Sequence, residues 1–370
     1  MKTRRIKTIL LFLSTMPFIG IYAQSIYYVS PHASSGGDGS PATPFHIIHE
    51  AVEKARKDKN CTTIYLREGE YILDTPLVLT SADGNDSKEL IIRNYPGEKA
   101  IISSGITLDL KWEKYKNGIM RAAVKGNPVM DMLIVNGDLR SMARYPDYDK
   151  TAVRFNGTSA LATAPERVKK WKNPEGGYLH AMHSHDWGDF HYRITGKNEK
   201  GELQLEGGWQ NNRPMGIHPE NRMVENIFEE LDAPGEWYYD KQEGWLYYYP
   251  LSDENINELV FETPQLKNLI EIAGTSSHPV KNITIEGIEL TQTIRTFMEH
   301  YEPLLRSDWT IYRGGAVIFR GTEKCTLRDC YIHHVGGNGV FFDKYNRNSA
   351  VTGSYLTSIG ASAICFVGDV

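Results

Sequence analysis

Residues 326–332, TLRDCYI, and residues 350–356, AVTGSYL, lie 24 positions apart (350 − 326 = 24) and decide the fold. Each is followed at the same distance by a glycine-containing turn and a second apolar run, at residues 340–342 and 364–366. Short β-type runs that recur at such a period are typical of a solenoid, in which each turn buries its apolar face against its neighbours. The sequence therefore predicts stacked coils in this part of the chain.

A third copy of the pattern lies upstream in two pieces. Residues 284–290 match the first strand at an offset of 42 (326 − 284), and residues 316–319 match residues 339–342 at an offset of 23 (339 − 316). The difference, 42 − 23 = 19 residues, predicts a loop near residues 294–313. Strands and turns this short favour a right-handed parallel β-helix, and a set of unrelated antiparallel hairpins is the alternative.

The first part of the chain resembles the start of the same solenoid. Apolar residues at helical spacing predict an amphipathic helix over residues 45–57, with Thr43 as its N-cap and Pro44 as its first residue. Such a helix would cover the exposed end of a solenoid. Short strands then follow, which we interpret as the first coils; they are expected at residues 63–66, 71–73, 77–79 and 90–95.

The middle of the chain has a different sequence pattern, with longer alternating strands, many aromatic residues and no 24-residue period. We interpret it as an antiparallel β-sandwich inserted into the solenoid. The predicted organisation is a signal peptide at 1–23, a cap helix and first coils at 24–105, the inserted sandwich at 106–265 and further coils at 266–370.

The N-terminus has the features of a secretion signal. A basic segment at residues 2–7 precedes an apolar run from Ile9 to Ile21, and Ala23 is a small residue suited to the cleavage position. This run is too short for a membrane span, so we expect a secreted or periplasmic protein. Removing the four basic residues changes the net charge from −5 to −9, which argues against a nucleic-acid partner.

Four cysteines are too few for a disulfide scaffold in a chain of 370 residues. Cys325 and Cys330 fall on the repeating strands, so we interpret them as small thiols stacked inside the solenoid, with a disulfide bridge as the alternative.

Several strings in a fixed order resemble a known family. They are YYVSP, IYLREGEY, LIIRNYPGEKAIISSG, LIVNGDLRSMARYPD, WGDFHYRITG and VENIFEELDAPGEWYYDKQEGWLYYYP. The chain resembles the N-terminal half of secreted bacterial right-handed parallel β-helix glycoside hydrolases, close to glycoside hydrolase family 141. The resemblance implies activity on plant cell-wall glycans, of the α-L-fucosidase or xylanase type, with no cofactor.

The chain stops inside a coil, at Val370, without a capping segment. The resemblance places the catalytic acids on later coils, so we expect an incomplete chain whose catalytic acids lie beyond residue 370.

Glycoside hydrolysis uses two carboxyl groups that flank the scissile bond. Among the coils present, Asp343 and Asp369 follow predicted strands and are the candidate catalytic residues. The alternative is that both are turn residues, because aspartate side chains bond to the backbone of turns.

Histidines supply the candidate substrate-binding residues. His183, His185 and His191 form a dense group around Trp187, whose indole suits stacking against a sugar ring, and His183 and His185 are expected on one face of a strand. His334 is also a candidate; because His333 and His334 are consecutive, one should point inward and the other outward. The spacing does not match a zinc site, so no metal is predicted.

The sequence thus predicts a carbohydrate-active protein that degrades polysaccharides by acid/base catalysis through paired carboxylates. A polysaccharide lyase is one alternative, although it would need basic residues or calcium in its groove. A non-catalytic glycan-binding or structural β-helix is the other. The expected partner is an oligosaccharide or polysaccharide.

Overall fold

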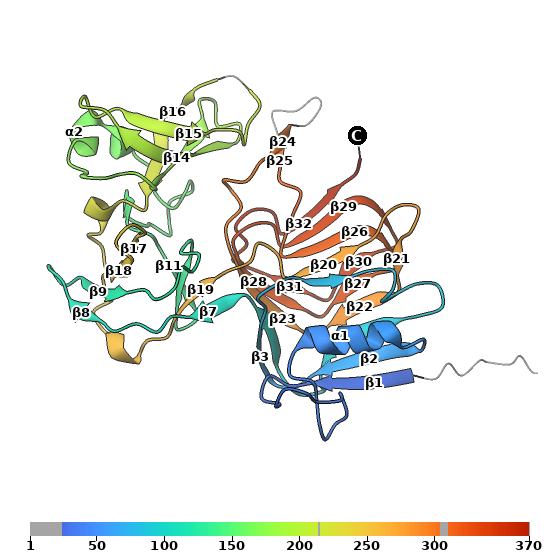
Figure 1. The fold of residues 1–370 in the computed structure, drawn as a ribbon. Helices are drawn as coiled ribbons and strands as arrows, with labels where there is room; N and C mark the ends of the chain where they lie inside the picture. The colour runs from blue at the N-terminus through green and yellow to red at the C-terminus, as the bar shows by residue number, and fades with distance from the viewer. Residues whose placement is uncertain (1–23, 214, 304–309, 370) are drawn as a thin grey trace, which may run out of the picture.

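A computed structural model describes residues 24–213, 215–303 and 310–369, and the predicted signal peptide lies outside them. Coils stack along one axis to form three parallel sheets, and each coil after β1 contributes one strand to each sheet (Figure 1). Sheet A consists of β1 (Gln24–Val29), β2 (Cys61–Leu66), β5 (Leu90–Asn94), β22 (Ile283–Glu286), β27 (Thr326–Arg328) and β30 (Ala350–Thr352).

The other two sheets follow the same order of coils. Sheet B consists of β3 (Gly69–Ile72), β6 (Ala100–Ser103), β23 (Glu289–Thr293), β28 (Tyr331–Val335) and β31 (Tyr355–Leu356). Sheet C consists of β4 (Leu77–Leu79), β20 (Ile270–Ala273), β26 (Val317–Glu323), β29 (Val340–Arg347) and β32 (Ile364–Val367), with β21 (Val280–Lys281) beside β26. The predicted class, an all-β parallel β-helix, is confirmed.

Strand pairing reproduces the offsets of the sequence repeat. Thr326 pairs with Ala350 and Thr284 with Thr326, at the predicted offsets of 24 and 42. Val317 pairs with Val340 at an offset of 23. The extra residues lie between β23 and β26, where β24 (Glu302–Pro303) and β25 (Thr310–Ile311) form a small hairpin, so the loop was predicted correctly.

A left-handed residue turns the chain from sheet A to sheet B in each late coil. Gly287, Asp329 and Gly353 occupy this position, with φ of 67°, 52° and 61°. Glycine suits the position because L side chains disfavour positive φ. Repetition of one backbone conformation at one phase keeps successive coils in register.

Apolar side chains stack between the three sheets to form the core. Phe319, Phe342 and Phe366 lie one above another, with ring centroids 4.6 Å and 4.4 Å apart. Cys325 and Cys330 are buried in the core as free thiols, which confirms their interpretation as stacked residues rather than a disulfide.

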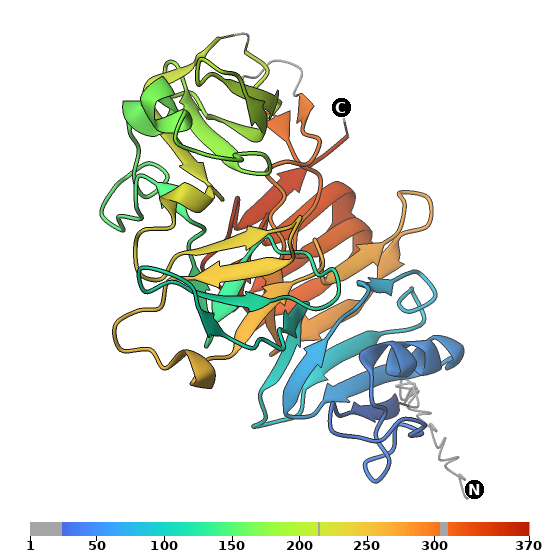
Figure 2. The same ribbon diagram turned by 60° about the vertical axis from the view of Figure 1, so that its left-hand side comes forward.

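The N-terminal helix is confirmed, but its predicted start is wrong. Helix α1 spans Ile48–Lys57 and packs its buried face, including Ala51 and Val52, onto the solenoid core (Figure 2). Thr43 and Pro44 do not begin the helix, because Phe45 bonds to Tyr28 and Ser30 as an extension of the first sheet.

Antiparallel sheets occupy the chain between β6 and β20. Sheet D contains β11 (Asp138–Arg140), β10 (Leu133–Val135), β19 (Phe261–Pro264) and β7 (Gly105–Thr107). Sheet E contains β17 (Trp237–Asp240), β18 (Trp245–Tyr248), β9 (Met120–Ala123) and β8 (Glu113–Lys114). Leu133, Trp237 and Phe261 are buried in a shared core between these sheets, which form the inserted sandwich.

A third antiparallel sheet extends the insert beyond the sandwich. Sheet F contains β12 (Arg144–Tyr145), β16 (Ile217–Glu225), β13 (Tyr178–His183), β14 (Asp189–Lys197) and β15 (Leu203–Gly207). It has a separate core around Trp171, next to α2 (Pro165–Val168) and the 3₁₀ turn η1 (Ala160–Thr163). Further 3₁₀ turns are η2 (Phe228–Glu230) and η3 (Ile256–Glu258).

Candidate functional site

The two predicted catalytic aspartates lie on the sheet C side of the last coils. Asp343, on β29, is 1% exposed and accepts hydrogen bonds from Arg313 Nη1 and Arg320 Nε, both at 2.7 Å. Asp369 follows β32, is exposed and lies 3.5 Å from Lys344 Nζ. The carboxylate of Asp343 is thus already neutralised by two guanidinium groups, and a catalytic role for either residue stays a prediction.

The histidine group of the insert is divided into two parts. His183 and His185 do not share a strand face, because β13 ends at His183 and the next residues turn. His183 is buried and stacks on Trp187 at 5.9 Å, while the His185 backbone N–H donates to His183 Nδ1. Trp187 is 51% exposed, with Arg213 above its ring at 5.1 Å.

His191 belongs to a different, buried cluster. Its Nδ1 lies 2.7 Å from Nδ1 of His180, whose Nε2 lies 3.1 Å from Glu225 Oε1. Glu225 also accepts a hydrogen bond from Arg295, which reaches across from the loop after β23. This ion pair links the solenoid to the insert, so His191 lies where the two parts contact each other. A role of His191 in substrate binding stays a prediction.

His333 and His334 do not alternate across the strand as predicted. Their Nδ1 atoms lie 2.8 Å apart, because His334 has a left-handed φ of 48° that turns its ring back towards His333. His333 Nε2 lies 3.0 Å from Glu289 Oε1, and Lys99 Nζ lies 2.8 Å from Glu289 Oε2. A chain of polar groups therefore runs along the outer face of sheet B.

Three glutamates gather at this face, and we call them, with His333 and His334, the sheet B cluster. Glu70 and Glu289 are both in register with Ile101 on β6, so they lie on one outward row of the sheet. Glu262 comes from β19 of the insert, and its Oε2 lies 3.4 Å from Gln292 Nε2 of β23. The insert thus brings a third carboxyl group to the solenoid surface.

The surroundings move the pKa values of these carboxyls in opposite directions. Burial raises the pKa of Glu70, with a further contribution from the charge of Glu289. Burial also raises the pKa of Glu262, assisted by the charge of Glu70. Burial acts the same way on Glu289, but hydrogen bonds from His333 and Lys99 outweigh it and lower the pKa. Carboxyls whose pKa values are pushed apart are suited to separate acid and base roles.

A hollow of about 320 Å³ adjoins the cluster. Glu98, Lys99, Glu289, Asp329 and Tyr331 are among the residues that line it. Tyr331 stacks on Tyr355 with centroids 5.6 Å apart, so the rings use their faces on each other. Tyr331 also stacks on His333 at 4.3 Å, whereas Tyr355 is 65% exposed and is the more accessible ring for a ligand.

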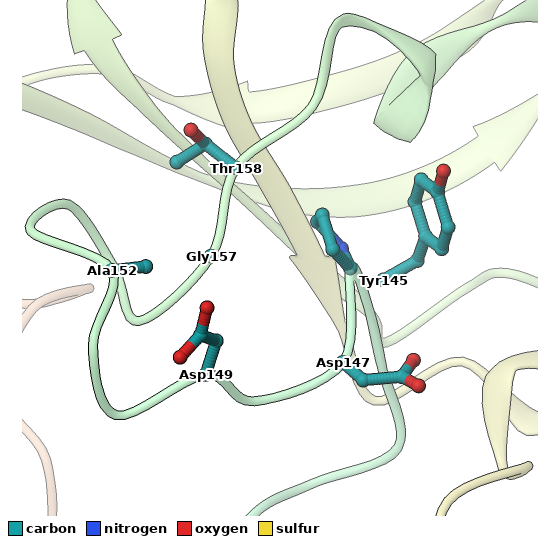
Figure 3. A pocket seen from close by; sticks show the side chains of 7 residues that line it. Tyr145, Asp147, Asp149, Ala152, Gly157 and Thr158 are labelled. Carbon is teal, nitrogen blue, oxygen red and sulfur yellow. The ribbon is translucent and has the colours of Figure 1, made fainter.

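The larger hollow, about 520 Å³, lies against the loop that follows β12 (Figure 3). Tyr145, Asp147, Asp149 and Thr158 line it, and the two carboxylates point in different directions. Among the residues that the structure describes, no group of three or more His, Cys, Asp or Glu side chains could hold a metal ion.

Glu236, close to this hollow, predicts a pH dependence of stability. Burial, reinforced by the charge of Asp147, raises the pKa of Glu236 to about 8 in the folded protein, above its unfolded value of about 4.3. The Glu236 carboxyl therefore keeps its proton to a higher pH in the folded protein than in the unfolded chain. We expect the free energy of unfolding to fall by roughly 4–5 kcal/mol as the pH rises from about 4 to 8. In Glu236→Gln, urea unfolding across this range should lack that decline; an unchanged slope would contradict the assignment.

The glutamates of the sheet B cluster were missed in the sequence. Glu289 and Glu70 each occupy an outward position of a strand, and Glu289 shares the repeat position of Tyr331 and Tyr355. A search for polar residues at one phase of the repeat would have found Glu289. No local signal identifies Glu262, because its position depends on how the insert folds back.

Comparison with known proteins supports the fold. No protein-family model matches the chain. It is 34% identical over 88 residues to the uncharacterized protein YwoF of Bacillus subtilis (strain 168), which is 23% of this chain and 17% of that protein. A solved structure described as XylC with xylose has a TM-score of 0.44 at 14% identity, over 85% of this chain and 41% of that one.

The chain is also similar to a solved structure described as a glycoside hydrolase. The TM-score is 0.73 at 20% sequence identity, over 89% of this chain and 65% of that chain. This chain thus spans somewhat less than two thirds of the length of that protein. No helix among the described residues is long and apolar enough to cross a bilayer. The likeness to that structure shows a shared fold.

Proposed function

We propose that this chain is part of a secreted or periplasmic glycoside hydrolase that acts at the sheet B cluster. The observation that carries the proposal is the pair of carboxyls with raised pKa, Glu70 and Glu262, beside the ionised Glu289. The family resemblance directs the proposal to plant cell-wall glycans, of the α-L-fucosidase or xylanase type.

Each carboxyl has a distinct chemical role in this proposal. Glu262, whose pKa is raised by burial, acts as the acid and donates its proton to the glycosidic oxygen as the bond breaks. Glu289, kept ionised by Lys99 and His333, supplies negative charge to the oxocarbenium-like transition state. The charge of Glu70 raises the pKa of Glu262 further, because two neighbouring carboxylates repel.

The test is a screen of the purified protein on aryl α-L-fucosides, aryl β-xylosides and xylan oligosaccharides, followed by Glu262→Gln. We expect kcat to fall about 100-fold on an oligosaccharide and less on an aryl glycoside, whose leaving group needs less protonation. Glu199→Gln, an exposed carboxyl on a distant turn, is the matched control.

Three results would contradict the proposal. Equal activity of Glu262→Gln and wild type would place the acid elsewhere. Products with new ultraviolet absorbance on uronate-containing glycans would indicate a lyase. Binding of oligosaccharides without turnover would indicate a glycan-binding protein.

A further inference from the structure

We propose that Glu289 and His333 fix the proton of His334 on Nδ1, so that Nε2 of His334 is the proton acceptor of the sheet B cluster. Its catalytic use rests on the function proposed above, whereas the position of the proton does not. The proposal is carried by three consecutive contacts: Glu289 Oε1 to His333 Nε2, His333 Nδ1 to His334 Nδ1, and Lys99 Nζ to Glu289 Oε2.

Proton counting along these contacts has one solution for neutral rings. An ionised carboxylate can only accept, so Nε2 of His333 must carry the hydrogen that bonds to Glu289. A neutral imidazole has a single N–H, which leaves Nδ1 of His333 as an acceptor. At 2.8 Å, the hydrogen between the two Nδ1 atoms must then come from His334. Nε2 of His334 is left with a free lone pair.

The charges around Glu289, His333 and His334 favour this arrangement of protons. Lys99 holds Glu289 ionised through its second oxygen, at 2.8 Å. Burial and the neighbouring His333 lower the pKa of His334, and Asp138 and Glu289 oppose this shift. Thr291 Oγ1 lies 3.3 Å from His333 Nδ1, and its hydroxyl can add a second donor to the same lone pair.

Nε2 of His334 is accessible to solvent. Among the described residues it makes no hydrogen bond, and it is not one of the fully buried atoms that lack a partner. Gln292 and His334 lie side by side, between the registered pairs Thr291–His333 and Thr293–Val335. Gln292 contacts Glu262, so the strand that neighbours His334 also holds the residue that bonds to the acid.

The chemistry balances with water as the second substrate. Water oxygen bonds to the anomeric carbon, and one water proton passes to Nε2 of His334. The glycosidic carbon–oxygen bond breaks, and the leaving oxygen takes the proton of Glu262. The cycle closes when His334 loses a proton to solvent and Glu262 regains one.

The position of the proton can be measured without any substrate. In protein labelled with ¹⁵N-histidine, long-range proton–nitrogen correlations should show His333 protonated on Nε2 and His334 on Nδ1 at pH 8. Glu289→Gln keeps an acceptor and should preserve both tautomers, whereas Glu289→Ala should produce a mixture at both rings. His278, an exposed histidine bonded to Ser277, is the control and should not change. Finding the His334 proton on Nε2 in the wild type would overturn the proposal.

Kinetics then test the catalytic use of the lone pair. On a glycan that the wild type cleaves, His334→Gln should lower kcat about 100-fold with little change in KM. Glu289→Ala and Glu289→Gln both remove a charge that raises the pKa of His334, so both should move the acidic limb of the kcat profile to lower pH. A normal kcat in a folded His334→Gln protein would overturn the catalytic use. Absence of turnover in the wild type would instead contradict the proposed function and leave the tautomer result standing.

Discussion

Replacing Phe342 by alanine is expected to destabilise the protein by about 3–5 kcal/mol. Phe342 is 2% exposed and lies between Phe319 and Phe366, with centroid distances of 4.6 Å and 4.4 Å. Because parallel coils cannot slide together without breaking their hydrogen bonds, the space left by the ring should remain as a cavity. Urea unfolding, followed by tryptophan fluorescence and by circular dichroism, measures the change.

The same stack provides its own control. Phe366 has the same ring at the same phase of the repeat, but it is 70% exposed. Phe366→Ala should therefore cost less than about 1 kcal/mol. Similar losses for the two variants would show that position in the stack does not govern the contribution of these rings.

The repeat could be predicted because its signal is local and repeated. A strand of three to five residues, a left-handed turn residue and the next strand recur within one coil, so each coil adds evidence for the same register. The start of α1 was predicted wrongly for a tertiary reason. Phe45 pairs with the first strand, and this contact outweighs the local preference of Thr43-Pro44 for a helix start.

The candidate site could not be predicted to the same extent, because it depends on long-range placement. Glu70 and Glu289 are 219 positions apart in the sequence (289 − 70). They lie on one outward row of sheet B because β6 pairs with both of their strands. Glu262 reaches them because β19 returns beside β7, where Thr263 pairs with Ile106. Alternation was misleading for His334, since a positive φ within the strand reverses the expected direction of its ring.

Arg295→Met is the second substitution with a large expected effect, again about 3–5 kcal/mol. Arg295 bonds to Asp131 Oδ1 through Nε at 3.0 Å and Nη2 at 2.9 Å, and to Glu225 through Nη1. Without the guanidinium, two largely buried carboxylates of the insert would lose their counter-charge. The loss should be seen in thermal unfolding as a separate, earlier transition of the insert, because the ion pairs link it to the loop after β23.

Acid unfolding distinguishes the loss of charge in Arg295→Met from a simple packing defect. Only the loss of charge makes the stability difference between wild type and variant depend on pH. Burial alone would raise the pKa of Glu225, but Arg295 and His180 outweigh it and hold the pKa far below its usual range. The stabilisation is therefore complete above the unfolded pKa of about 4.3 and is lost as the pH falls below it. The stability difference between wild type and Arg295→Met should thus shrink between about pH 4 and pH 2.

A triple variant separates charge from shape in this cluster. Asp131→Asn and Glu225→Gln, added to Arg295→Met, remove both carboxylates that the lost guanidinium would leave unpaired. We expect the triple variant to recover most of the lost stability and to lack the acid-dependent difference, because replacing all partners of a buried ion pair is often close to neutral. If it stayed as unstable as Arg295→Met, the packing of Arg295 against Phe297, at 4.7 Å, rather than its charge would hold the insert to the solenoid.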